Sequence, residues 1–255
     1  MTRAALALWR REVLGFLRDR ARVAGVVAQP VLFWLLFGFG FEGVVAVPGS
    51  DGPYLQYLLP GAVALTLLFT AIYATISVVE DRQSGVLQAA LVAPQPRLAV
   101  VLGVVLGGTT LAVGQGALVA LLAPTVGLQP GFAGAAVALA AAVLLAVQFT
   151  ALGFAFAWRL RTTRAYHAVM NVLLLPVWLL SGAFFPLAGA PGPLRLVMLA
   201  NPATYGVALL RHGLHGLPGD VPGTAVGAGL AAVVSVTFAA VLLALAAATA
   251  RRPLY

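Results

Sequence analysis

The chain has 255 residues, of which 62% are hydrophobic and only 9% are charged, and its formal net charge is +8. An ordinary soluble domain is about half apolar and about a quarter charged, so this composition argues against a soluble protein and predicts one that resides in a lipid bilayer. All 15 basic residues are arginine, and the chain contains no cysteine, which excludes disulfides, thiolate metal sites and a cysteine nucleophile.

Six segments are long and apolar enough to cross a bilayer, since a spanning helix needs about 20 predominantly apolar residues. They cover residues 23–45, 54–79, 98–123, 132–158, 166–185 and 224–250. Turn formers or charged residues close these segments, as in VPGSDGP, EDRQSG and RLRTTR. We therefore predict an all-α integral membrane protein with a single transmembrane domain over residues 1–255.

The arginines orient these spans, because short cytoplasmic loops carry an excess of basic residues. All but Arg195 and Arg211 fall in residues 3–22, 82–97, 159–164 and 251–252, which the six spans place on one side. This distribution predicts a multi-pass protein of the cell (inner) membrane with both termini in the cytoplasm. The even number of spans independently agrees with that topology, and membrane orientation explains the positive charge without nucleic acid.

Residues 1–22 have the pattern of an amphipathic helix that lies in the membrane interface. One face carries apolar residues, namely Leu6, Trp9, Val13, Phe16 and Leu17, and the other side and its flank carry Arg10, Arg11, Arg18 and Arg22. Such arginines can contact lipid headgroups, and Trp9 suits the boundary between water and lipid. The alternative is a basic segment that only sets the topology.

The cytoplasmic connection EDRQSGVLQAALVAPQPR, residues 80–97, is too long to be only a turn. Its interior consists of helix formers with Leu87 and Leu91 on one side, and Pro94 and Pro96 stop the pattern. We predict a short helix whose apolar stripe contacts a partner or the membrane surface. The alternative is a short helix that packs back on the protein's own spans.

Two segments resemble the ABC-2 type permeases, the membrane subunits of ABC exporters related to drug-resistance and polysaccharide-export permeases. The order of residues in the cytoplasmic connection is similar to that of the family, on Glu80, Arg82, Gly85, Leu87, Leu91, Pro94 and Arg97. The segment SGAFFPLAGAPGPLRLVMLANPATYGVALLRHGL, Ser181 to Leu214, resembles the family's segment after the fifth span, on Asn201, Pro202, Thr204, Tyr205 and Arg211. The chain departs from the usual family pattern at Val86 and Gln88, which commonly are Thr and Glu.

The resemblance implies roles for both segments. The connection 80–97 would be a coupling helix that inserts into a groove on an ATPase subunit. Residues 186–223 would form re-entrant outer helices, in which the side chain of Asn201 satisfies freed backbone groups. Tyr205 and Arg211 would then be candidates for an outer gate, and the alternative is an interfacial loop without a gating role.

The energy source is expected on another polypeptide. A phosphate-binding loop of the G-x-x-x-x-G-K-[ST] type needs a lysine, and this sequence has none. We therefore expect ATP and magnesium on a separate ATPase subunit, with no catalytic residue, cofactor or metal site on this chain. A gradient-driven carrier normally keeps an acidic or histidine side chain within the membrane, and none lies centrally in the six predicted spans.

We predict the permease subunit of an ATP-driven exporter that moves an amphipathic, lipid-like or glycan-type cargo. By resemblance it would work as a homodimer with two ATPase subunits and would not be an enzyme by itself. A gradient-driven carrier or a membrane enzyme of another class remains the alternative.

Overall fold

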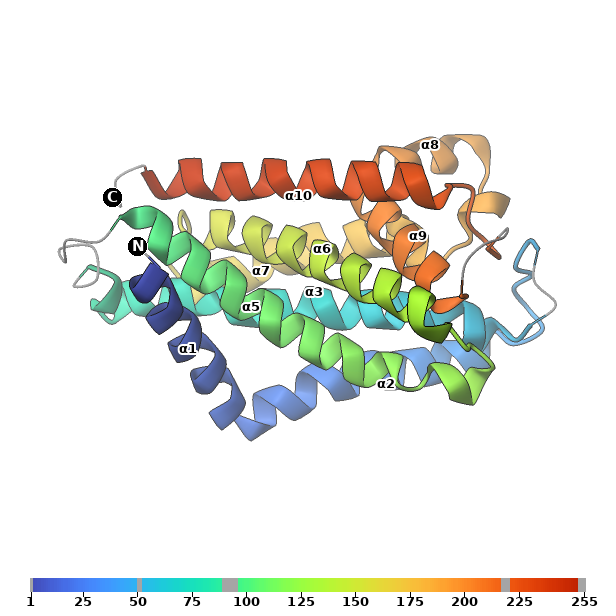
Figure 1. The fold of residues 1–255 in the computed structure, drawn as a ribbon, viewed down its shortest axis with the longest axis horizontal. Coiled ribbons are helices and arrows are strands. Elements are labelled where there is room, and N and C mark those ends of the chain that lie inside the picture. The colour runs from blue at the N-terminus through green and yellow to red at the C-terminus, as the bar shows by residue number, and fades with distance from the viewer. Residues whose placement is uncertain (1, 50–51, 89–95, 217–220, 252–255) are drawn as a thin grey trace.

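The computed structural model describes residues 2–49, 52–88, 96–216 and 221–251 (Figure 1). The long helices are α1 (Thr2–Arg18), α2 (Arg20–Gly40), α3 (Tyr54–Gln83), α5 (Arg97–Ala120), α6 (Gly131–Ala157), α7 (Thr163–Trp178) and α10 (Ala228–Arg251). The shorter elements are the 3-10 helices η1 (Ala123–Val126) and η3 (Leu187–Gly189), the π-helix η2 (Leu179–Ala183), and the helices α8 (Gly192–Ala200) and α9 (Pro202–Leu214). The described residues include no strand, which confirms the predicted all-α class.

Within the described residues, six helical segments are long and apolar enough to cross a membrane, as the sequence predicts. They are Arg20–Gly40, Tyr54–Gln83, Arg97–Val126, Gly131–Ala157, Thr163–Ala183 and Ala228–Arg251. Most ends lie within a few residues of the predicted ones. The informative difference is α3, which continues past Val79 as far as Gln83. Glu80 and Asp81 therefore lie in the last turn of this helix and not in a loop.

Helix α3 is the centre of the bundle. In its most apolar window 83% of the residues are buried, whereas the corresponding share is 22% for α2 and 28% for α10. The outer helices can leave apolar side chains such as Leu36 and Val233 exposed because lipid chains solvate them as well as protein does. The first residues of α1 and the last of α10 lie at the same end of the bundle, together with the end of α3 and the start of α5 (Figure 1).

Helix α1 packs across α5 at two glycines. A Cβ placed on Gly103 would meet the Leu8 side chain at 2.5 Å, and one on Gly107 would meet Glu12 at 2.8 Å, so glycine is what permits this approach. The face of α1 that the protein buries contains Ala5, Glu12 and Phe16. Of the predicted apolar face, Phe16 is buried against the spans and Leu6 and Leu17 are exposed, so its contact with the membrane interface stays a prediction. The buried side also includes the carboxylate of Glu12. Asp19 ends α1 and caps α2 by accepting a hydrogen bond from the backbone N–H of Arg22 at 3.0 Å.

Helix α9 lies against α6 at a second close contact between backbones. A Cβ on Gly213 would stand 2.4 Å from the backbone nitrogen of Ala138, and one on Gly134 would stand 2.6 Å from the carbonyl oxygen of Gly213. Backbone atoms cannot move aside as the end of a flexible side chain can. This contact fixes the position of α9, which is too short to cross a bilayer, among the spans.

Replacing Gly213 with valine should destabilise the protein strongly, because the new side chain overlaps the backbone of α6 and overpacking typically costs about 1–3 kcal/mol or more. Gly114→Val is the matched control, since Gly114 also lies in a helix and a Cβ there meets nothing within 4 Å. Thermal unfolding of both purified variants in detergent measures the difference. Equal midpoints would contradict the close packing of α6 and α9.

Candidate functional site

We call the end of the bundle opposite the start of α1 and the end of α10 the outer end, and there α7 departs from regular α-helix. The π-helix η2 follows Trp178, and within it Gly182 has a φ of 79°, a conformation that favours glycine. Pro176, shortly before, has no backbone N–H to donate. Irregular backbone leaves carbonyl groups without their helical partners, and at membrane depth other protein groups must bond them. The residues around η2 supply those bonds.

Arg211 of α9 is buried at this place, with 1% of its surface exposed. Its Nη1 donates a hydrogen bond to the carbonyl oxygen of Tyr57 at 2.7 Å, and its Nη2 donates to that of Gly182 at 3.0 Å. The guanidinium carbon lies 3.8 Å from the centroid of the Tyr57 ring, within cation–π range. Among the described residues no carboxylate pairs with Arg211. Carbonyl dipoles and an aromatic face compensate for its buried charge instead.

Aromatic side chains bond the same stretch of backbone. The Tyr57 hydroxyl donates to the carbonyl of Gly182 at 2.7 Å, so this carbonyl accepts from both Tyr57 and Arg211. The Tyr54 hydroxyl donates to the carbonyl of Phe184 at 2.7 Å. In the reverse direction, the indole N–H of Trp178 donates to the carbonyl of Gly61 in α3 at 2.9 Å. Residues 54–61 of α3 are thus joined by hydrogen bonds to residues 178–184.

Asn201 bonds two backbones at once. Its Nδ2 donates to the carbonyl of Val177 at 2.6 Å, and its Oδ1 accepts from the N–H of Ala203 at 3.0 Å, which caps the start of α9. The Asn201 side chain therefore bonds backbone groups of α7 and α9. Thr204 donates to the carbonyl of Met198 at 2.5 Å and lies 3.4 Å from that of Leu180. We call the set formed by Tyr57, Gly182, Asn201, Thr204 and Arg211 the outer clamp.

The other predicted residues of the outer segment lie beside the clamp. Pro202 occupies the first turn of α9, where the missing N–H costs no helical bond. Tyr205 is half-buried and donates to the carbonyl of Leu199 in α8 at 2.9 Å, which places it outside the clamp. Burial and the nearby charge of Arg211 lower the pKa of His215 to about 4. His215 is therefore neutral at neutral pH and adds no second positive charge next to Arg211.

The geometry is that of a structural link between helices and not that of a catalytic site. It joins residues of α3, η2 and α9 through bonds to backbone carbonyls, and it presents no nucleophile next to a base. Within the described residues, no group of three His, Asp or Glu side chains is placed to hold a metal ion. What the outer clamp does is fix the relative position of three segments that are far apart in the sequence.

The end of the bundle that holds the start of α1 and the end of α10 contains the other predicted residues. Arg82 donates to the carbonyl of Leu160 at 2.9 Å and to that of Trp158, which joins the end of α3 to the connection between α6 and α7. Gly85 has a φ of 80° and turns the chain after α3. Val86 is then 45% exposed, whereas Leu87 is 3% exposed and belongs to the protein's own core. The outward apolar residue of this turn is thus Val86, and Leu87 follows the alternative in which the segment packs back on the spans.

Two further predicted coupling residues, Leu91 and Pro94, lie outside the described residues. Arg97 opens α5 and donates to the carbonyls of Ala250 at 3.2 Å and Arg251 at 2.9 Å. A cation at this position satisfies carbonyls at the end of α10 and complements the helix dipole. Arg97 therefore ties the start of α5 to the end of the last span.

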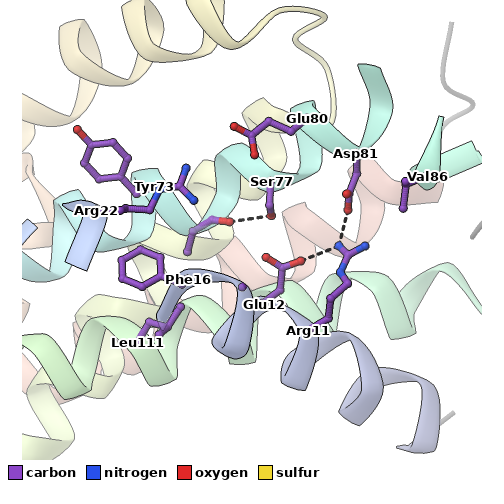
Figure 2. Close-up of a pocket in the computed structure, with 12 residues that line it drawn as sticks. Arg11, Glu12, Phe16, Arg22, Tyr73, Ser77, Glu80, Asp81, Val86 and Leu111 are labelled. Carbon is purple, nitrogen blue, oxygen red and sulfur yellow. Dashed lines mark hydrogen bonds and ion pairs between the residues drawn. The ribbon is translucent and has the colours of Figure 1, made fainter. Parts of the chain in front are cut away.

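Helix α1 is linked to α3 by an ion-pair cluster. Arg11 donates to the carboxylate of Glu12 at 2.7 Å and also contacts that of Asp81 (Figure 2). Burial lowers the pKa of Arg11, but its hydrogen bonds to the two carboxylates outweigh this and raise the pKa overall. The Trp9 indole N–H donates to the Thr110 hydroxyl at 3.0 Å. Arg10 and Arg18 are exposed, as expected for residues that face water and headgroups.

Sequence reasoning missed Tyr57 and the cluster around Arg11. Tyr54 and Tyr57 stand three residues apart at the start of an apolar span, so an available signal was a pair of aromatic residues with polar tips on one helical face. The partner of Arg11 could not be found in this way, because Asp81 lies 70 positions further along the chain.

Comparison with known proteins places the chain among membrane transport proteins. The family model of the ABC-2 type transporter matches residues 3–215. The chain is 28% identical to a transport permease, ycf38, of Cyanophora paradoxa over 192 residues, which are 74% of this chain and 66% of that protein. It is 29% identical to nodulation protein J of Sinorhizobium fredii over 84% of this chain and 82% of that protein. It is 26% identical to nodulation protein J of Rhizobium leguminosarum bv. viciae, over 84% and 83%.

The outer clamp predicts an energetic coupling between Tyr57 and Arg211, because both donate to the carbonyl of Gly182. Tyr57→Phe keeps the ring under the guanidinium, and Arg211→Met keeps much of the volume, so each single variant leaves that carbonyl one donor. The double variant leaves it none and should lose about 1–3 kcal/mol more than the sum of the singles. Reversible unfolding of the four proteins measures this, and strictly additive losses would show that the carbonyl does not need either donor.

Proposed function

Because the chain belongs to the ABC-2 type transporter family, we propose that it is the permease subunit of an ATP-driven exporter. The observation that carries this proposal is the match of residues 3–215 to the family, together with six candidate spans and a bundle end that holds the start of α1, the end of α3 and the end of α10. The chain is not itself catalytic, and ATP with magnesium belongs to a separate ATPase subunit. We place it in the cell (inner) membrane with both termini in the cytoplasm.

The ATPase binds the cytoplasmic end at the turn after α3. Glu80 and Val86 are exposed there, and Arg82 and Arg97 fix this end by bonding the connection between α6 and α7 and the end of α10. A movement imposed on this turn would therefore reach several spans. Leu87 serves as an internal anchor of the turn and not as a contact residue, since the protein's own core covers it.

The outer clamp is the part of the permease that opens and closes. It holds α3, η2 and α9 by hydrogen bonds to carbonyls, and such bonds can exchange partners without breaking the fold. Helix α3 contributes Tyr57 to the clamp and Glu80 to the cytoplasmic end, so one rigid element reaches both. A displacement of α3 by the ATPase would therefore strain the hydrogen bonds of the outer clamp directly.

A second copy of the permease completes the pathway, and an amphipathic cargo of lipid or glycan type suits it. Gln115 and Gln148, which are buried within α5 and α6, are neutral polar residues, and exposed side chains of α2 and α10 such as Leu36 and Val233 are apolar. Such surfaces accommodate molecules that are partly lipid-like.

The coupling surface can be tested with Val86→Asp, which places an unpaired carboxylate at the ATPase contact. The variant should insert and fold normally, because Val86 is already 45% exposed, and should reduce copurification of a coexpressed ABC ATPase that binds the wild-type protein about tenfold or more. Gln129→Asp makes the same charge change on an exposed residue at the opposite end and should have no effect. Normal copurification and ATP hydrolysis with Val86→Asp would overturn the contact, and a wild-type protein that binds no ATPase would overturn the exporter.

The topology can be tested with single cysteines, since the chain has none. Cysteines at Phe132 and Ala188, which are exposed at one end, should react with an impermeant thiol reagent added outside intact cells. Cysteines at Gln88 and Arg161, exposed at the other end, should react only after the cells are opened. Labelling of position 88 from outside would reverse the orientation and remove the basis of the coupling proposal.

A further inference from the structure

A cavity of about 480 Å³ lies beside the cytoplasmic half of α3, between α1 and the start of α2 (Figure 2). One part of its lining is apolar and the other part is polar. Phe16, Tyr73 and Leu111 form an apolar and aromatic part, and Glu80 and Asp81 lie near the end of α3. From Tyr73 to Glu80 the helix rises about 10 Å, at roughly 1.5 Å per residue. The cavity therefore has a deep apolar part and a shallow polar part.

Two opposite charges in this cavity have no ionic partner among the residues that the structure describes. Arg11 is already bonded to Glu12 and Asp81. Within the part of the chain that the structure describes, the carboxylate of Glu80 makes no ion pair or hydrogen bond. The guanidinium of Arg22 makes only cation–π contacts there, at 5.8 Å from the Phe16 centroid and 5.7 Å from the Tyr73 centroid. The cavity thus offers one free cation and one free anion.

The order of these charges matches the direction of a phospholipid. Arg22 lies in the first turn of the span α2 and beside Tyr73, whereas Glu80 lies in the last turn of α3. Arg22 is therefore nearer the bilayer, and Glu80 nearer the cytoplasm. In a zwitterionic phospholipid the phosphate is likewise nearer the acyl chains and the ammonium nearer water.

We propose that this cavity binds the headgroup of a phospholipid with a primary ammonium, namely phosphatidylethanolamine, with its phosphate on Arg22 and its ammonium on Glu80. The lining of the cavity suits an ammonium that donates hydrogen bonds better than a quaternary ammonium, which has no N–H group. Arg22 already occupies the Phe16 and Tyr73 rings, so they are not free to surround a choline group. A carboxylate bonds best to a group that carries N–H donors.

The remaining charges favour the same ligand. Glu12 and Asp81 more than neutralise Arg11, so the polar part of the cavity is net acidic and attracts an ammonium. An anionic headgroup would place its extra hydroxyl or charge against these carboxylates without any gain. The Ser77 hydroxyl, which donates to the carbonyl of Ala74 at 2.8 Å, keeps lone pairs that can accept from the ammonium.

The test is a lipid titration of the purified full-length protein by native mass spectrometry. The probes share one pair of acyl chains and carry ethanolamine, its mono- and dimethyl derivatives, choline or glycerol as headgroup. Affinity should fall stepwise as methyl groups replace N–H donors, with at least about a tenfold difference between ethanolamine and choline. Soluble glycerophosphoethanolamine should bind far more weakly than the intact lipid, because it lacks the chains.

The variants assign the two ends of the headgroup. Glu80→Gln should remove most of the preference for ethanolamine over choline, and Arg22→Gln should weaken both lipids about equally, since both contain the phosphate. Arg22→Lys keeps the charge and should retain binding. Arg18→Gln removes a charge from an exposed residue outside the cavity and is the control. This inference does not depend on the ATPase proposal, as no ATPase is present.

Equal affinity for ethanolamine and choline lipids, or an unchanged preference in Glu80→Gln, would overturn the assignment. Equal binding of soluble glycerophosphoethanolamine and intact lipid would show that the ligand is a soluble molecule and would overturn the lipid assignment as well.

Discussion

The structure depends on one constraint, which is that carbonyl groups freed at membrane depth must find donors within the protein. Helix α7 ends in a π-helix with a left-handed glycine, and without donors its carbonyls would be buried unpaired. The outer clamp supplies them from α3 and α9. This explains how the buried Arg211 is tolerated without an acidic partner among the described residues, since it donates to the carbonyls of Tyr57 and Gly182.

The clamp in turn requires α9 to lie among the spans, and small residues make that possible. Gly213 of α9 meets the backbone of Ala138, and Gly206 leaves room for Leu145. At the other end the same device holds α1, which crosses α5 at Gly103 and Gly107. Two helices that do not cross the bilayer are therefore attached to the spans through glycines, one at each end. Helix α3 runs between them and contacts both the outer clamp and the ion-pair cluster around Arg11.

The sequence predicts the spans well because their signal is local. Each is a run of apolar residues closed by turn formers, and the ends differ from the structure by a few residues. The role of Asn201 was also predictable, since a short polar side chain before Pro202 caps a helix. The orientation of Leu87 was not, because a single turn of helix carries no information on which side the spans will cover. The burial of Glu12 was not predictable for a related reason, as its carboxylate pairs with Arg11 and its side chain packs at Gly107 of α5.

The measurement that tests the clamp most directly is hydrogen exchange of the unmodified protein in bilayer nanodiscs. If the side chains of α3 and α9 replace water around η2, the amides of residues 179–183 should exchange about as slowly as those in the middle of α3, although η2 is not regular α-helix. The exposed residues 42–44, which lie between spans at the same end, should exchange rapidly and provide the internal reference. Exchange of residues 179–183 as rapid as in that reference would show that water reaches this backbone, and would contradict the outer clamp.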